Sequence, residues 1–281
     1  MERSKLVVDI DSLGNLVEIE ELVKLASQKG LEVGNLSGLS VVFLKSENFV
    51  TVKHKIGLAL LASACFQKAM SLNGVSLVDF QNAGINLITD GEKFYGFWGE
   101  KYSLDARGRN VYYVDIVGVA DKVRSGGVGG KLGEICLNNF LKNNWNRDTV
   151  ILTRTQNPMM LGALKNCLPK EVSLYPFESN PCSEWIDSVN ALVANGFISR
   201  NNRKDSHFDA KDSSIHWGAY GMYGDGSTWE NMISNYMDDI DWSKTIPRQM
   251  IEYLLKNGTD LNDCLTRGHA LIVGAYVCSP K

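Results

Sequence analysis

The pattern of hydrophobic and polar positions divides the middle of the chain into a strand, a glycine-rich turn, a helix and a second strand. Residues 111–119 are almost wholly β-branched or aromatic, with only Asp115 and Gly118 interrupting them, which predicts a strand covered on both faces. From Gly127 onward the apolar residues recur at helical spacing, so a helix is predicted to begin inside the glycine cluster. The next apolar run, 149–155, predicts the second strand.

Similar patterns predict further elements on both sides of this segment. Asp90-Gly91 is a typical hairpin turn between two strands. The remaining predicted elements are strands at 6–10, 40–44, 86–89, 93–104, 171–176 and 270–277, and helices at 17–28, 51–72 and 159–167.

The glycine cluster has the properties of an anion-binding site. Gly129, Gly130 and Gly133 would each cost about 0.8–1 kcal/mol relative to alanine inside a helix, so the chain needs bare backbone there, for helix packing or for a ligand. A helix start offers unpaired N–H groups and the positive end of the helix dipole, and Arg124 adds a side-chain donor. The alternative is a tight surface turn that needs glycine only for its backbone angles.

Two common phosphate-binding motifs do not fit this cluster. A dinucleotide-binding fingerprint needs a third glycine where Leu132 stands and an acid after the next strand, where Arg154 and Gln156 stand. A Walker loop needs a glycine in place of Ser125 and a hydroxyl residue in place of Leu132. Each motif therefore fails at two positions.

The cluster and the strand that follows it resemble the two signatures of the GNAT superfamily of N-acyltransferases. The acyl-CoA loop of that superfamily, Arg/Gln-x-x-Gly-x-Gly/Ala leading into a helix, is similar to Arg124-x-x-Gly127-x-Gly129. Its second signature is a strand ending in an asparagine that opens another helix, and Asn157 stands at that place. The two signatures occur in the right order, and the resemblance covers residues 84–177.

The resemblance implies an α/β fold of the GNAT type, with a mixed sheet, an N-terminal extension and a large insertion before the last strand. The extension would be residues 1–36 and the acyl-CoA-binding core residues 37–177. The insertion, expected to form the acceptor side, would be residues 178–267, and the last core strand residues 268–281. That strand is expected to pair with the short strand at 171–176.

The resemblance also implies the cofactor and its ligands. Acetyl-CoA (coenzyme A) is the expected acyl donor, with its pyrophosphate on main-chain N–H groups where the helix begins. The main chain at the end of the 111–119 strand would bind the pantetheine arm. Asn157 would contact the cofactor or the following helix, and it would equally serve as an N-cap before Pro158. The expected cofactor-binding residues are Val117, Val119, Arg124, Ser125, Gly126, Gly127, Val128, Gly129, Gly130 and Asn157.

Acyl transfer to an amine requires a base and a proton for the leaving thiolate. Asp115 is the best-placed base, because an acid within a buried strand is costly unless it is paired, so it is either functional or structural. Glu100 and His216 are weaker candidates. Many family members carry a tyrosine seven residues past the asparagine to protonate the thiolate, where this chain has Leu164. The other expected proton donors are Tyr113, Tyr220, Tyr223 and solvent.

These features favour an acetyl-CoA-dependent N-acetyltransferase that acts on a primary amine of a small molecule or peptide by direct attack in a ternary complex. Because the family tyrosine is replaced, the alternative is a catalytically weak acyl-CoA-binding or interaction module. A nucleotide-binding domain is a third hypothesis. The aromatic and glycine-rich segment 215–229 is typical of a ligand pocket and equally of packing beneath a long loop.

Composition and charge limit the partners and the cellular location that are expected for this chain. The chain has 281 residues, 44% hydrophobic and 22% charged, which is enough for a sizeable core. A net charge of −3 without dense basic runs argues against a nucleic-acid partner. No apolar run approaches the ~20 residues of a membrane span, and the N-terminus does not resemble a signal peptide. A cytoplasmic protein without a membrane partner is therefore expected, and a homodimer is left open.

Cysteine and histidine usage predicts neither disulfides nor a metal centre. The six cysteines include no Cys-x-x-Cys pair, and the four histidines show no metal-ligand spacing. The cysteines are therefore expected to be reduced packing residues, and no metal site is expected.

Overall fold

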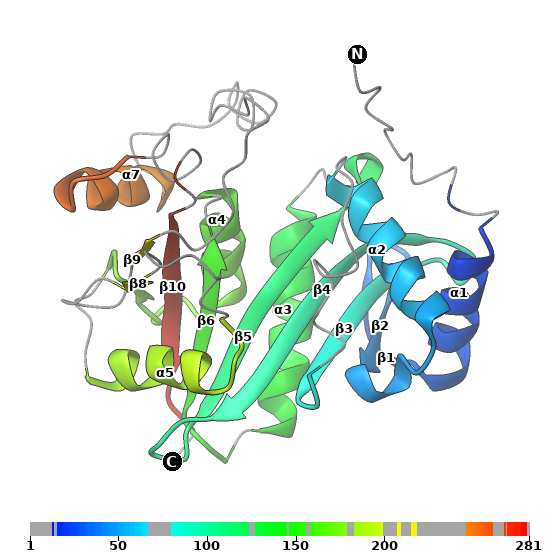
Figure 1. Ribbon diagram of the computed structural model, residues 1–281, viewed down its shortest axis with the longest axis horizontal. Coiled ribbons are helices and arrows are strands. Elements are labelled where there is room, and N and C mark those ends of the chain that lie inside the picture. Colours follow the sequence, from blue (N-terminus) through cyan, green and yellow to red (C-terminus); the bar gives the residue numbers. More distant parts are fainter. Residues whose placement is uncertain are drawn as a thin grey trace. The chain divides into compact units, whose positions relative to one another are not determined.

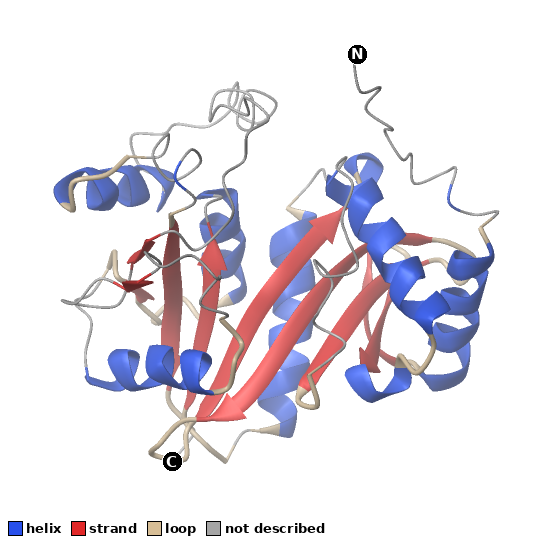
Figure 2. Cartoon of the chain, in the orientation of Figure 1, coloured by secondary structure: helices blue, strands red, loops and turns tan. Residues whose placement is uncertain are grey.

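The computed structural model confirms the mixed α/β class (Figures 1 and 2). The chain divides into two compact units, residues 1–102 with 114–144 and residues 103–113 with 145–281. The strands β4 and β5 each contribute residues to both units. The structure describes residues 13, 16–66, 80–123, 127–144, 146–155, 158–178, 183–198, 207–208, 215–217, 246–260, 267 and 269–279.

The first unit contains strands in the order β1-β2-β3-β4-β5. The first three neighbouring pairs in this order are antiparallel. Short turns join β1 to β2 and β3 to β4, as expected for antiparallel strands, whereas α2 lies between β2 and β3 in the chain. The tight turn between β3 and β4 contains Asp90 and Gly91, so the predicted hairpin is confirmed. The strands are β1 (Leu31–Leu36), β2 (Leu39–Lys45), β3 (Ala83–Thr89), β4 (Phe94–Leu104) and β5 (Asn110–Val119).

Two helices, α1 (Val17–Lys29) and α2 (Val52–Phe66), share a hydrophobic core with one face of these strands. Alternate residues of β3, Ile85 and Leu87, belong to this core together with Phe97 of β4. The helices themselves cross closely, because a Cβ at Gly57 would lie 2.5 Å from the carbonyl oxygen of Glu18. These contacts fix which residues of β3 and β4 face the helices.

A third helix, α3 (Val128–Asn143), packs on the opposite face of the first unit's strands. Tyr102 follows Lys101 along β4, and Lys101 pairs with Ala83 of the helical core, so Tyr102 faces away from α1 and α2. The ring of Phe140 on α3 lies 6.0 Å from the ring of Tyr102. This helix therefore begins after β5 and runs back along the sheet (Figure 1).

The second unit contains the strand order β5-β6-β10-β9-β8, with β7 also paired to β10. β10 lies antiparallel to β6, and the short strand β7 pairs with β10 at Gly274↔Tyr175, so the predicted pairing of the last strand is confirmed. The strands are β6 (Thr149–Thr155), β7 (Leu174–Tyr175), β8 (His207–Phe208), β9 (Ile215–Trp217) and β10 (Ala270–Val277). The helices are α4 (Pro158–Cys167), α5 (Ser183–Ala194) and α7 (Ile246–Lys256).

A polar network joins the starts of β5 and β6 in this unit. The backbone N–H of Asn110 donates to the carbonyl oxygen of Asp148 at 2.9 Å, so the two strands begin at the same edge of the sheet. The Asp148 carboxylate accepts hydrogen bonds from the Tyr276 hydroxyl and the Ser279 N–H. The bond from Tyr276 is the main cause that lowers the pKa of Asp148. Burial, followed by the same bond, raises the pKa of Tyr276 to about 12.

Gly274→Ala is expected to destabilise the second unit, because a Cβ at this position would lie 1.9 Å from the carbonyl oxygen of Ile151 on the paired strand. Overpacking of this kind costs about 1–3 kcal/mol. Gly162→Ala in α4 is the matched control, since nothing lies within 4 Å of its Cβ and alanine is favoured in helices by about 1 kcal/mol. Urea unfolding should therefore show opposite changes for the same substitution, and equal changes would contradict the β6–β10 register.

The structure corrects two sequence predictions and leaves two outside the described residues. The strand expected at 171–176 is only Leu174–Tyr175, because a turn in which the N–H of Val172 bonds the carbonyl oxygen of Pro169 precedes it. The sequence also missed β1, which is a half-exposed edge strand with an irregular register between Glu32 and Gly34. The predicted strand at 6–10 and the end of the helix predicted to reach residue 72 lie outside the described part of the chain.

Candidate functional site

The glycine cluster forms the start of α3, as the periodicity predicts. Gly127 is the residue before the helix and has a left-handed backbone with φ 74° and ψ 24°, a conformation that glycine adopts without steric cost. Nothing lies within 4 Å of a Cβ at Gly127, so its backbone angles rather than its packing require glycine. This N-cap residue has no side chain that could bond the N–H groups of the first turn, and a helix start of this kind favours an anion.

The next residues of the helix differ in their exposure. Val128 and Gly130 are buried, whereas Gly129 is partly exposed. A side chain at position 129 would therefore project from the first turn beside the N–H groups that an anion would use. The sequence-predicted ligands Arg124, Ser125, Gly126 and Asn157 lie outside the described residues.

The end of β5 is packed tightly against its neighbours in the first unit. A Cβ at Gly96 of β4 would lie 2.7 Å from the carbonyl oxygen of Gly118. A Cβ at Gly118 would lie 2.6 Å from the ring of Phe97 and 2.9 Å from Cys65 of α2. Protein packing thus explains both glycines, and it holds the main chain at the end of β5 in place. Val117 is partly exposed there and Val119 is buried.

Asp115 on β5 is paired with a residue that the sequence analysis did not single out. The Lys101 ammonium of β4 lies 3.1 Å from the Asp115 carboxylate and 4.0 Å from the ring centroid of Phe80. The Lys101 side chain is 3% exposed and that of Asp115 is 21% exposed. The carboxylate can therefore reach solvent or a ligand, while its partner is enclosed and stabilised by both a carboxylate and an aromatic face.

Glu100 is not brought together with Asp115. It is adjacent to Lys101 on β4, so its side chain points to the opposite face of the sheet. It is 3% exposed and accepts a 3.0 Å hydrogen bond from the Asn86 amide of β3. This buried position makes Glu100 a poorer candidate than Asp115 for contact with an acceptor.

The second unit holds the remaining described candidates. Tyr113 is 1% exposed and stacks on Phe197 with ring centroids 6.4 Å apart. His216 is fully buried, and its Nδ1 atom lies 3.4 Å from the Arg154 guanidinium. Because arginine cannot accept a hydrogen bond, Nδ1 is the acceptor and the proton of a neutral ring lies on Nε2. That tautomer suits a hydrogen-bond donor better than a general base.

The remaining candidates concern the proton donor for the thiolate. Leu164, which stands where many GNAT proteins have tyrosine, is fully buried in α4. Tyr220 and Tyr223 lie outside the described residues.

Within the described ranges, no group of three or more His, Cys, Asp and Glu residues could hold a metal ion. In the same ranges, no helix combines the length and the apolar character needed to cross a membrane.

Several solved structures have a partial similarity to this chain. No family model matches the sequence, and no curated protein matches it significantly. An aminoglycoside acetyltransferase from an uncultured soil metagenomic sample has a TM-score of 0.37 at 16% identity, over 47% of this chain and 89% of that chain. A ribosomal-protein-alanine N-acetyltransferase from Brucella melitensis has a TM-score of 0.32 at 15% identity, over 41% and 80% of the two chains.

A further match is the NatC complex bound to Gag peptide and CoA, with a TM-score of 0.32 and 16% identity over 44% of this chain and 80% of that chain. The first two of these structures are named as acetyltransferases. Similarity of this size does not identify the acyl donor or the acceptor of this chain.

Proposed function

We propose that this protein is an acetyl-CoA-dependent N-acetyltransferase that acts on a primary amine of a small molecule or peptide by direct attack in a ternary complex. The observation that carries the proposal is the start of α3. A left-handed glycine and two further glycines lie at this helix start, which follows β5 and the short 3-10 helix Asp121–Val123 in the chain. Such a helix start suits the pyrophosphate of coenzyme A.

The cofactor-binding part of the proposal rests mainly on main-chain atoms. Gly127, Val128, Gly129 and Gly130 would hold the pyrophosphate, assisted by the loop residues from Arg124 to Gly126. The main chain of Val117 and Val119 would bind the pantetheine arm, because the close packing of Gly96 and Gly118 fixes its position. Asn157 would contact the cofactor or cap α4.

The catalytic part of the proposal assigns the base to Asp115. Acetyl-CoA would supply the acyl group as an activated thioester. The Asp115 carboxylate would accept a proton from the acceptor ammonium, because only the neutral amine has the lone pair that forms the new C–N bond. Tyr113, Tyr220, Tyr223 or solvent would return a proton to the thiolate when the C–S bond breaks. The insertion, residues 178–267, would form the acceptor side.

One observation favours a second candidate function. Leu164 is fully buried where the family tyrosine would stand, and Tyr113 is 1% exposed. A protein that has no side chain positioned to protonate the leaving thiolate would bind acyl-CoA and turn it over slowly. The alternative is therefore a catalytically weak acyl-CoA-binding or interaction module.

A thiol-release assay with acetyl-CoA and a panel of primary amines separates the two candidates. We expect release of coenzyme A that depends on one class of amine, with the acetylated amine detected by mass spectrometry. Binding of coenzyme A in calorimetry without thiol release for any amine would favour the weak module. Binding of ATP or NAD but not of coenzyme A would contradict both and favour a nucleotide-binding domain.

A further inference from the structure

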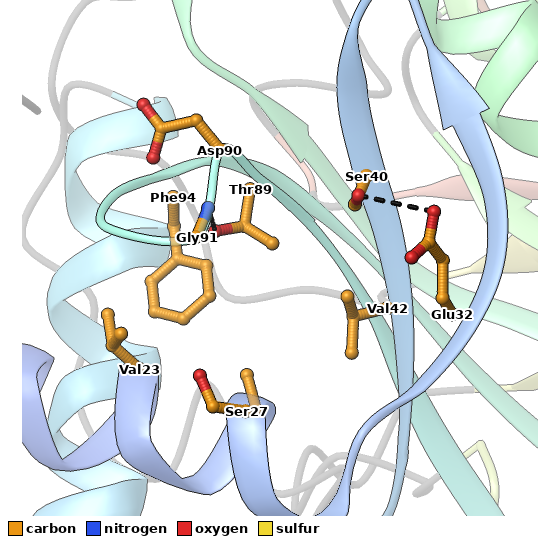
Figure 3. Close-up of a pocket in the computed structure, with 10 residues that line it drawn as sticks. Val23, Ser27, Glu32, Ser40, Val42, Thr89, Asp90, Gly91 and Phe94 are labelled. Atoms are coloured by element: carbon orange, nitrogen blue, oxygen red, sulfur yellow. Dashed lines mark hydrogen bonds between the residues drawn. The ribbon is translucent and has the colours of Figure 1, made fainter.

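A cavity of about 160 Å³ lies within the first unit, between α1, the β1–β2 hairpin and the β3–β4 turn (Figure 3). It is far from the ion pair at Asp115. The cavity is lined by Phe94 at the start of β4, and Lys101 is seven residues further along that strand, which corresponds to about 23 Å. Nothing in the proposed acyl transfer uses this cavity.

The lining has an apolar side and an acidic rim. Val23 of α1, Val42 of β2 and Phe94 present carbon atoms to the cavity, and Glu32 contributes an exposed carboxylate, whereas the carboxylate of Asp90 points away from the cavity. None of the ten lining residues is basic. A cavity with this lining favours a small ligand that has an aliphatic body and a positive charge.

The two carboxylates are not neutralised by the residues around them. Among the described residues, neither Glu32 nor Asp90 forms an ion pair. Glu32 accepts a 3.3 Å hydrogen bond from the Ser40 hydroxyl, beside Val42. Burial alone would raise the pKa of Asp90, but hydrogen bonds from the Tyr95 hydroxyl and the Lys93 N–H outweigh it and lower the pKa.

The volume limits the ligand further. A cavity of about 160 Å³ holds a short aliphatic chain but not a nucleotide or an aminoglycoside. In Figure 3 the Glu32 carboxylate and the Ser40 hydroxyl lie together on one side, while Val23 and Phe94 lie on the other. A single ammonium group beside Glu32 would thus leave the attached chain against the apolar residues.

We propose that this cavity binds a small primary alkylammonium ion. Its ammonium group donates hydrogen bonds to the Glu32 carboxylate and the Ser40 hydroxyl, and its alkyl chain lies against Val42, Val23 and Phe94. The ligand thereby bridges α1 and β1 to the β3–β4 turn, at a site separate from the one proposed for acyl transfer.

Calorimetry of the whole chain with n-butylamine at pH 7 and low salt tests this proposal, with n-butanol and butyrate as matched probes. We expect butylamine to bind at millimolar concentrations more tightly than butanol, no binding of butyrate, and weaker binding at high salt. Glu32→Gln should weaken butylamine at least about fivefold, which corresponds to about 1 kcal/mol. Ser27→Phe, which places a ring at the exposed end of the cavity, should abolish binding.

Glu134→Gln is the control, because Glu134 is an exposed acid on α3 that does not line the cavity. It removes the same charge and should leave butylamine binding unchanged. Equal affinity for butanol and butylamine, unchanged binding by Glu32→Gln, or no binding to the natural sequence would each overturn the proposal. These outcomes are independent of thiol release, so failure here is distinguishable from failure of the acyltransferase proposal.

Discussion

Gly129→Glu is expected to abolish coenzyme A binding while the protein remains folded. Position 129 is the second residue of α3 and is partly exposed. A carboxylate there would occupy the N–H groups proposed for the pyrophosphate and would repel its negative charge. Affinity should fall at least about a hundredfold, equivalent to about 3 kcal/mol. Isothermal titration calorimetry with coenzyme A measures this directly.

The same substitution should not harm the helix itself. An acidic side chain in the first turn interacts favourably with the helix dipole, and glutamate has a higher helix propensity than glycine. Asn138→Glu is the matched control, because Asn138 is an exposed position further along α3. It adds the same charge and should leave coenzyme A affinity unchanged. Unaltered affinity of Gly129→Glu would count heavily against a pyrophosphate at this helix start.

Long apolar runs and glycine positions allowed much of the fold to be predicted from sequence. The strands at 149–155 and 270–277 were predicted with their observed bounds. A short apolar run rich in β-branched residues favours a strand buried on both faces over other secondary structure. The start of α3 was predicted because the apolar period changes there. β1 was missed because an edge strand with a glycine and an irregular register shows neither a continuous run nor a clean alternation.

Candidate site residues were harder to predict than strands. Asp115 could be singled out, because an acid within an apolar strand needs an explanation. Lys101 could not, since its partner is on the neighbouring strand and only the strand register brings the two together. Glu100 and Lys101 are adjacent in sequence, yet they lie on opposite faces of β4. A shift of one residue in the register would exchange their roles.

The ion pair of Lys101 and Asp115 should have a large effect on stability as well as on turnover. Asp115→Asn would leave the 3%-exposed ammonium of Lys101 without its carboxylate. Breaking a buried pair in this way costs about 3–5 kcal/mol, and the lower end is expected because Asp115 is 21% exposed. If Asp115 is the base, turnover should also fall by about 10²–10⁴, with little change in coenzyme A affinity.

A double variant separates the structural role of this pair from the proposed catalytic role. Replacing both charges in Lys101→Met with Asp115→Val should return the free energy of unfolding to within about 1 kcal/mol of the natural protein, because apolar residues of similar volume commonly replace buried ion pairs without loss. Urea unfolding measures this recovery. Thiol release with acetyl-CoA and amine, recorded across pH, measures turnover of the same protein.

The double variant is expected to be stable under both explanations of the pair, and its turnover distinguishes them. If Asp115 accepts the proton of the acceptor amine, the double variant is stable, binds coenzyme A and still lacks turnover. If the ion pair has only a structural role, packed against the ring of Phe80, turnover recovers together with stability. A stable double variant with the turnover and the pH–rate profile of the natural protein would remove Asp115 as the base. In that case the proton of the acceptor would have to leave through another group or through solvent.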